Sequence, residues 1–165
     1  MTDMIFENPD LSLWILLSRA YRSLRHFRRR EIAKCGLSIE QAGVLTVIKY
    51  LGNYAKPIDI AREMLRAPQT IAPIIDILLK KGLIETTRDK QRKNIVRISL
   101  TAKGEEVYKC SLKMGAIGDV LASLTEPERR NLREVLEKII DESHRYRVSE
   151  DEAEFDYDER QYILN

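Results

Sequence analysis

The stretch that decides the fold runs from Lys56 to Tyr108 and reads KPIDIAREMLRAPQTIAPIIDILLKKGLIETTRDKQRKNIVRISLTAKGEEVY. Pro57 and Pro68 stand where helices begin, because a first-turn proline lacks only an amide that would have no helical partner there. Apolar residues follow each proline at spacings of three and four, and Gly82 suits the left-handed exit of the second helix. The pattern predicts two short consecutive helices, the second ending at Lys80-Lys81-Gly82.

A β-hairpin is expected directly after these helices. Residues 83–87 and 94–100 are rich in β-branched side chains, which favour strands. The polar run between them, Arg88-Asp89-Lys90-Gln91-Arg92-Lys93, is typical of a hairpin tip.

One more short helix is expected before Lys56. Ser38 and Gln41 have the spacing of a capping box, and an apolar stripe follows before the chain reaches Gly52-Asn53. Three short helices and a hairpin are typical of a winged helix-turn-helix, so we expect a mainly α fold with a small β wing.

Long helices are predicted on both sides of this unit. The first carries an apolar face at Leu13, Leu17, Ala20, Leu24 and Phe27. It also carries a run of cations, Arg19, Arg22, Arg25, Arg28, Arg29, Arg30 and Lys34. These cations form either a solvated face or contacts with phosphate groups. Thr101 begins a fifth helix with apolar Val107, Leu112, Ile117, Val120 and Leu121. A capping box of Thr125 and Glu128 begins the last one, with apolar Leu132, Val135, Leu136, Ile139 and Ile140. These stripes exceed what the central unit covers, so we expect packing against one another and a second copy; an ordinary intrachain core is the alternative.

Charge is distributed unevenly along the chain. The segment from Ser149 onward holds seven acidic residues and one basic residue, whereas residues 1–148 hold 27 basic and 19 acidic residues, a net charge of +8. Such a basic body suits a polyanion, although a body that is basic only because the tail is acidic is the alternative.

Several classes of protein are disfavoured by the composition. Cys35 and Cys110 form no CxxC or zinc-ligand spacing, and only His26 and His144 accompany them, so we expect neither a metal site nor a cofactor. Neither histidine has the local setting of a catalytic base, so we expect no enzyme and no catalytic residues. The apolar run at Leu13 is far shorter than the ~20 residues that span a bilayer, so we expect no membrane partner and a soluble, cytoplasmic protein.

The order of these elements, the Lys56–Tyr108 stretch and the run LTEPERRNLREVLEKI from Leu124 together resemble the MarR (multiple antibiotic resistance regulator) family. KKGLIE, a charged hairpin and SLTAKG are its most specific motifs here. The resemblance implies a single domain over residues 1–148, with dimerisation helices at 11–35 and 101–146 around a winged helix-turn-helix at 37–100. It does not cover the acidic tail at 149–165, which we expect to be flexible because it is highly charged and poor in spaced apolar residues. It further implies a homodimer that binds double-stranded DNA as a transcription regulator, with residues 68–81 in the major groove and the wing in the minor groove. We expect this regulator to be a repressor.

The resemblance also implies a set of DNA contacts. Thr70, Asp76, Leu78 and Gly82 match the family pattern, whereas Pro73 replaces a common arginine and Asn94 replaces the usual wing arginine. Pro73 removes the amide that would bond to the carbonyl of Gln69, so we expect a kinked helix. The expected contacts are Arg62, Arg66, Gln69, Thr70, Ala72, Pro73, Lys80, Lys90, Arg92, Lys93 and Asn94.

Direct base readout from this set is expected to be sparse. Among the groove-facing residues Gln69, Thr70, Ala72, Pro73 and Ile77, Gln69 alone suits a bidentate contact, typically to adenine. Sequence preference is therefore expected from DNA shape or from contact with thymine methyl groups. Apolar residues on this face equally suit a protein-interaction module with little or no DNA binding, which is the alternative function.

Effector sensing is implied by the resemblance alone. Tyr21, Phe27, Tyr50 and Tyr54 are candidates to line a cleft for a small aromatic ligand, with ordinary core packing as the alternative. Cys35 is a candidate redox residue because Arg30 and Lys34 lower the pKa of a nearby thiol, although a helix C-terminus opposes that effect. The acidic tail either competes with phosphate for the basic surface or only aids solubility.

Overall fold

The computed structural model describes residues 8–52, 55–88 and 96–163, with side chains described as far as Tyr146. The chain divides into two compact units, Met1–Gly118 and Asp119–Asn165, and each is considered by itself. None of the helices in the described ranges combines the length and apolar character needed to cross a membrane.

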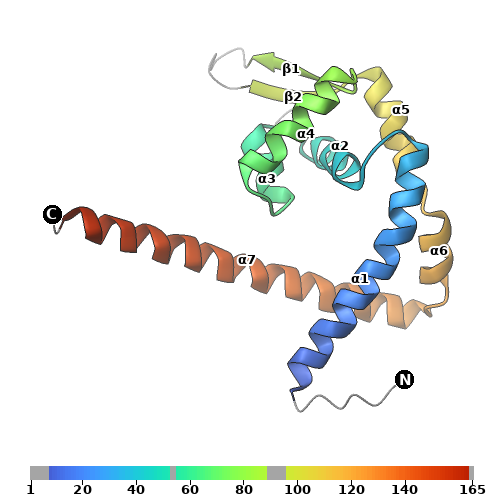
Figure 1. Ribbon diagram of the computed structural model, residues 1–165. Helices are drawn as coiled ribbons and strands as arrows, with labels where there is room; N and C mark the ends of the chain where they lie inside the picture. The colour runs from blue at the N-terminus through green and yellow to red at the C-terminus, as the bar shows by residue number, and fades with distance from the viewer. Residues whose placement is uncertain (1–7, 53–54, 89–95, 164–165) are drawn as a thin grey trace. The chain divides into compact units, whose positions relative to one another are not determined.

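The first unit contains a long helix, four shorter helices, a hairpin and the start of one more helix (Figure 1). The long helix α1 (Pro9–Lys34) begins at Asn8, whose side chain accepts hydrogen bonds from the amides of Asp10 and Leu11. The remaining elements follow in order: α2 (Ile39–Leu51), α3 (Pro57–Glu63), α4 (Pro68–Lys80), β1 (Ile84–Arg88), β2 (Val96–Leu100), α5 (Ala102–Ser111) and α6 (Gly115–Ala122). This order confirms the mainly α fold with a small two-stranded wing.

The helix ends follow local sequence signals. Ser38 and Gln41 form the predicted capping box, because Ser38 Oγ accepts from the Gln41 amide while Gln41 Oε1 accepts from the Ser38 amide. Thr101 caps α5 as predicted by accepting from the amide of Gly104. Gly82 closes the exit of α4 with a φ of +66°, a conformation that suits glycine.

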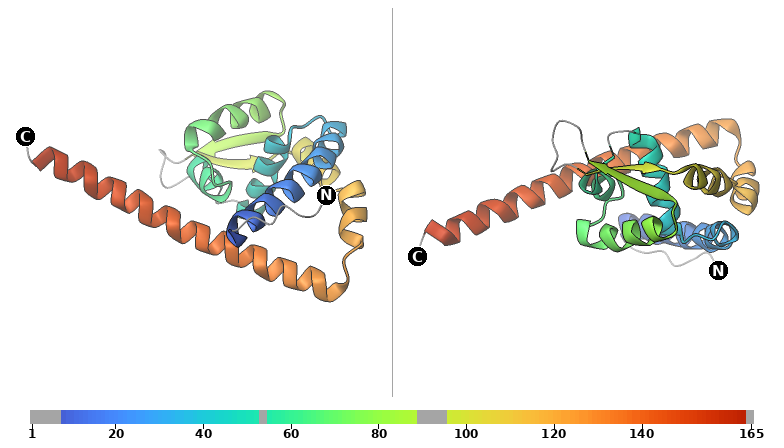
Figure 2. Two further views of the ribbon diagram at one scale, coloured as in Figure 1. Left: turned by 60° about the horizontal axis from the view of Figure 1, so that its bottom comes forward. Right: turned by 90° about the horizontal axis from the view of Figure 1, so that it is seen from above.

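One core joins α2, α3, α4 and the hairpin. Its fully buried members include Leu45 of α2, Ile60 of α3, Ile71 and Leu78 of α4, and Ile98 of β2. Burying each such side chain stabilises the fold by about 1.5–3 kcal/mol. These elements gather around the hairpin in both views of Figure 2.

The hairpin is antiparallel, with Ile84 opposite Leu100 and Arg88 opposite Val96. The amide of Ile98 donates to the carbonyl of Ala55 at 2.9 Å, which ties β2 to the chain just before α3. Arg88 belongs to β1, whereas the sequence pattern placed it in the hairpin tip.

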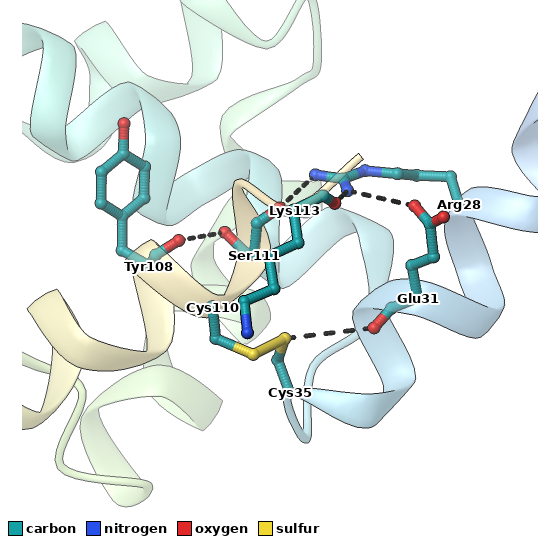
Figure 3. The surroundings of a disulfide bond; sticks show 7 residues. All are labelled: Arg28, Glu31, Cys35, Tyr108, Cys110, Ser111 and Lys113. Atoms are coloured by element: carbon teal, nitrogen blue, oxygen red, sulfur yellow. Dashed lines mark hydrogen bonds and ion pairs between the residues drawn. A yellow bond between two sulfur atoms is a disulfide. The ribbon is translucent and has the colours of Figure 1, made fainter. Parts of the chain in front are cut away.

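The prediction of one continuous fifth helix after Thr101 is wrong. α5 ends at Ser111 and α6 begins at Gly115, so Leu112 lies between the two helices. Two side chains of α1 satisfy the backbone groups that the break exposes. Arg28 donates to the carbonyls of Ser111 and Lys113, at 2.6 and 2.9 Å (Figure 3). Glu31 Oε1 accepts from the amide of Ala116 at 2.7 Å.

A disulfide joins the same two regions. Cys35, the residue after α1, is bonded to Cys110 of α5 across 75 residues of sequence (Figure 3). Cys35 is therefore not the free thiol that the sequence suggested, and its partner Cys110 had no expected role.

The second unit consists mainly of α7 (Glu126–Ile163). The Glu128 carboxylate accepts from both the amide and the hydroxyl of Thr125, each at 2.7 Å. The helical backbone continues through the acidic segment to Ile163, so the chain does not change to irregular structure at residue 149. The division into one domain at 1–148 and a flexible tail stays a prediction.

Candidate nucleic-acid interface

The helix α4 has one buried face and one exposed face. Ile71, Ile75 and Leu78 are no more than 6% exposed and pack into the core. The residues on the other side are exposed, and we call this set the α4 stripe: Gln69, Ala72, Pro73, Asp76, Ile77 and Lys80. Thr70, which is also exposed, lies at the first turn beside it. The core thus fixes which side chains α4 presents outward.

Pro73 lies inside α4, and the helix continues through it to Lys80. Proline has no amide proton, so the carbonyl of Gln69 has no donor four residues ahead. The kink expected at this position stays a prediction.

The turn between α3 and α4 contains a strained residue that no local sequence signal marks. Leu65 has a φ of +53°, in the left-handed region that glycine and asparagine normally occupy. Its amide donates to the carbonyl of Arg62, and the next amide, of Arg66, donates to Ala61. The turn that orients α4 therefore holds its geometry without the glycine that would have signalled it.

The cations of α3, α4 and β1 and of the turn before α4 differ in their exposure and bonding. Arg62, Arg66, Lys80 and Arg88 are exposed, and Arg62 has an ion pair at 3.7 Å with Asp59 while its side chain stays 73% exposed. By contrast, Lys81 donates to the Gly36 carbonyl and to Gln41 Oε1, so it holds α4 against the start of α2. The four exposed cations, unlike Lys81, are therefore available to bind phosphate groups.

The wing is held close to the end of α4. Thr101 Oγ1 donates to the carbonyl of Gly82 at 2.7 Å, and the Thr101 amide donates to Leu83. A Cβ atom at Gly104 would lie 1.9 Å from the Leu83 carbonyl oxygen, so only glycine permits this approach of α5 to the strand. The predicted wing contacts Lys90, Arg92, Lys93 and Asn94 lie outside the described residues.

A cavity of about 630 Å³ lies between the second half of α1 and the break between α5 and α6. Its apolar lining comes largely from Phe27, Ile32 and the two disulfide cysteines. The charged residues of the lining are four cations, Arg28, Arg30, Lys34 and Lys113, and one acid, Glu31. Glu31 Oε2 is buried without a hydrogen-bond partner, and its nearest cation is the Arg28 guanidinium at 3.7 Å.

The four aromatic residues considered for an effector cleft lie in different places. Phe27 lines the cavity, whereas Tyr21 on α1 and Tyr50 on α2 are 61% and 77% exposed. Tyr54 lies outside the described residues. Across the part of the chain that the structure describes, no group of three or more His, Cys, Asp or Glu side chains is placed to hold a metal ion.

Comparison with known proteins identifies the fold and the family. The MarR family profile matches residues 37–95. The HTH-type transcriptional regulator BilQ of Clostridium symbiosum (strain WAL-14163) is 31% identical over 119 residues, which cover 68% of this chain and 79% of BilQ. The chain belongs to the MarR family. Its MarR fold is that of transcription regulators with a winged-helix DNA-binding unit, and members of this family are not enzymes.

Two solved structures extend the comparison. The organohalide-sensing regulator RdhR-CbdbA1625 shares 26% identity with this MarR chain and has a TM-score of 0.68, covering 83% of this chain and 87% of its own. The S. aureus MepR–DNA complex has a TM-score of 0.69 at 17% identity, and the match covers 81% of this chain and 98% of the MepR chain. At this identity the likeness supports the fold alone.

Proposed function

We propose that this chain is a sequence-preferring regulator of transcription that binds double-stranded DNA as a homodimer and represses the genes it occupies. The observation that carries the proposal is the α4 stripe, which the core turns outward and which includes Lys80. Further exposed cations are Arg62 on α3, Arg66 in the turn before α4, and Arg88 at the end of β1. The major groove of DNA is wide enough to admit an α-helix, and the cations suit the phosphate groups that border the groove. The S. aureus MepR–DNA complex is a structure of the same fold with DNA bound.

The homodimer is supported by apolar side chains that each unit leaves uncovered. In α1, Leu13, Trp14 and Leu16 are 61–65% exposed. In α7, the exposed residues are Leu132, Val135, Ile139 and Ile140. Because monomeric proteins rarely expose such continuous stripes, a second copy is the natural partner for them. A cytoplasmic location is part of the same proposal, because the protein must have access to the DNA that it regulates.

Binding to the DNA directly upstream of the chain's own gene tests this function, with a scrambled duplex as the control. Expected are a solution mass twice the chain's 19.2 kDa, tighter binding to the upstream duplex, and weaker binding as salt is raised. Gln69→Ala should weaken binding to the preferred duplex more than to the scrambled one. No binding to either duplex at low salt would remove this function and favour the protein-interaction module suggested by Ala72, Pro73 and Ile77.

A second proposal concerns regulation by a small molecule. The cavity beside Phe27 combines apolar walls with a surplus of cations, which suits a small aromatic anion such as a phenolate. RdhR-CbdbA1625, which senses organohalides, has been solved with 2,4-dichlorophenol bound. Calorimetric titration with 2,4-dichlorophenol should show binding that Lys34→Gln weakens, and the ligand should change DNA affinity. Absence of heat with the native protein would contradict the proposal.

A redox role is proposed for Cys35 together with Cys110, since the two form one disulfide. The cytoplasm keeps most thiols reduced, so the pair is expected to change state with the supply of peroxide or of a dithiol reductant. Equal DNA affinity before and after complete reduction would limit the bond to a structural role.

A further inference from the structure

The α4 stripe is unusually apolar for a surface that meets DNA. Ala72, Pro73 and Ile77 are exposed in its middle, and Ile77 is 42% exposed although its neighbours Ile75 and Leu78 are buried. Ile77 is therefore not one of the buried core residues of α4. Together with Ala72 and Pro73, the exposed part of this isoleucine offers an apolar surface to a partner of α4.

The spacing of the stripe matches a short run of base pairs. One ridge along the helix is formed by Gln69, Pro73 and Ile77, because successive members are four residues apart. The ridge is about 12 Å long at 1.5 Å per residue. It therefore passes about three to four base-pair steps of 3.4 Å each.

The chemistry of the ridge selects among the four bases. The C5-methyl of thymine is the apolar group that base edges present in the major groove, and Gln69 suits the N6 and N7 atoms of adenine. Asp76 accepts hydrogen bonds only, so it suits the amino groups of adenine or cytosine and opposes the two acceptors of guanine. We propose that Ala72, Pro73 and Ile77 read thymine methyl groups, so that the half-site is a short run of A·T pairs with Gln69 at one end.

This inference rests on the proposed DNA-binding function and commits the ridge to one partner. The exposed cations on α4 and on the elements before and after it, Arg62, Arg66, Lys80 and Arg88, favour a polyanion over an apolar protein surface. A protein partner is therefore an outcome of the test and not part of the proposal.

The test uses a duplex selected from a random library by the full-length protein. Thymines are then replaced by deoxyuracil, which removes the methyl group and leaves charge and base pairing unchanged. Each methyl group removed from beneath the ridge should weaken binding roughly fourfold, the equivalent of about 0.8 kcal/mol. The salt slope should stay the same because no phosphate is altered.

A double-mutant cycle assigns the effect to the helix. Ile77→Ala removes the exposed side chain and retains a good helix former, so the fold is preserved, with circular dichroism as the check. The variant should bind the thymine duplex more weakly and should lose most of its sensitivity to deoxyuracil. Arg66→Ala is the matched control, because it should weaken binding to both duplexes by the same factor.

The outcomes are distinguishable. If native protein selects a duplex but binds the deoxyuracil form equally well, the inference is overturned and the DNA-binding function stands. If Ile77→Ala remains as sensitive to deoxyuracil as native protein, the assignment to this ridge is overturned. If no duplex is selected and a protein partner is found to need Ile77, the proposed function fails together with the inference.

Discussion

The Arg28 guanidinium on α1 donates through Nη2 to the carbonyl oxygen of Ser111, 2.6 Å away and 83 residues later in the sequence. This hydrogen bond lies at the last turn of α5, and Nη1 of the same side chain reaches the carbonyl of Lys113. Glu31, also on α1, accepts from the amide of Ala116 at the start of α6. The two side chains together let the chain break between α5 and α6 without leaving those backbone groups unpaired.

Replacing Arg28 by methionine should therefore destabilise the first unit. The change retains an apolar stem but removes two charge-assisted hydrogen bonds, at a cost of about 1–3 kcal/mol. Urea unfolding of the variant measures the loss. Arg29→Met, one position along and exposed, is the matched control and should change stability little. Equal midpoints for the two variants would show that the break does not depend on Arg28.

Reduction of the Cys35–Cys110 disulfide should also lower stability. The bond closes a loop across 75 residues, so its loss returns conformational entropy to the unfolded chain and costs about 2–4 kcal/mol. Denaturant unfolding with and without dithiothreitol measures this difference. The double variant with Cys35→Ser and Cys110→Ser should be insensitive to the reductant, and a native protein that is equally insensitive would contradict the prediction.

Leu65 gives a test of backbone strain. A non-glycine residue with positive φ costs about 1–2 kcal/mol. Leu65→Gly and Leu65→Ala remove nearly the same side-chain atoms, but only glycine relieves the strain at φ +53°. The glycine variant should melt at higher temperature than the alanine variant, by an amount equivalent to about 1 kcal/mol. A higher melting temperature for the alanine variant would contradict the prediction and would mean that the turn relaxes when the leucine side chain is removed.

Stability should depend on pH through Glu40. A hydrogen bond to its own backbone amide is the largest cause that lowers the pKa of this carboxyl below its ordinary 4.5, with Ser38 and Arg25 adding to it and partial burial opposing it. The folded pKa is lower than the unfolded one, so the stabilisation is present above pH 4.5 and is lost as pH falls through the folded pKa. Unfolding of native protein and Glu40→Gln from about pH 7 to about pH 3 should show a difference that disappears in acid. A difference that stays constant with pH would contradict this cause.

Local signals explain which parts of the fold are visible in the sequence. The Ser38–Gln41 capping box, the starts of α3 and α4 at Pro57 and Pro68, and the Gly82 exit each depend on a few adjacent residues. Such patterns act within one turn of helix, so they can be recognised before any tertiary interaction is known.

The features that the sequence did not predict depend on residues far apart in the chain. The break between α5 and α6 lies within an apolar pattern that suits one continuous helix, and it is stabilised by Arg28 and Glu31. The disulfide likewise joins cysteines that share no local motif. At the candidate site, sequence alone could not separate Lys81, which is bonded to Gly36 and Gln41, from the exposed Lys80 beside it.

DNA recognition by the exposed face of α4 is tested most directly by fluorescence anisotropy of a labelled duplex across a salt series, with Lys80→Glu compared with Lys109→Glu. Lys109 is exposed on α5 and serves as the control for the change of charge. Native protein and Lys109→Glu should lose affinity steeply with salt, whereas Lys80→Glu should bind more weakly with a log–log slope reduced by about 0.9 for each phosphate that the variant no longer neutralises. Identical slopes for native protein and Lys80→Glu, or no binding by native protein at low salt, would contradict DNA recognition by this face.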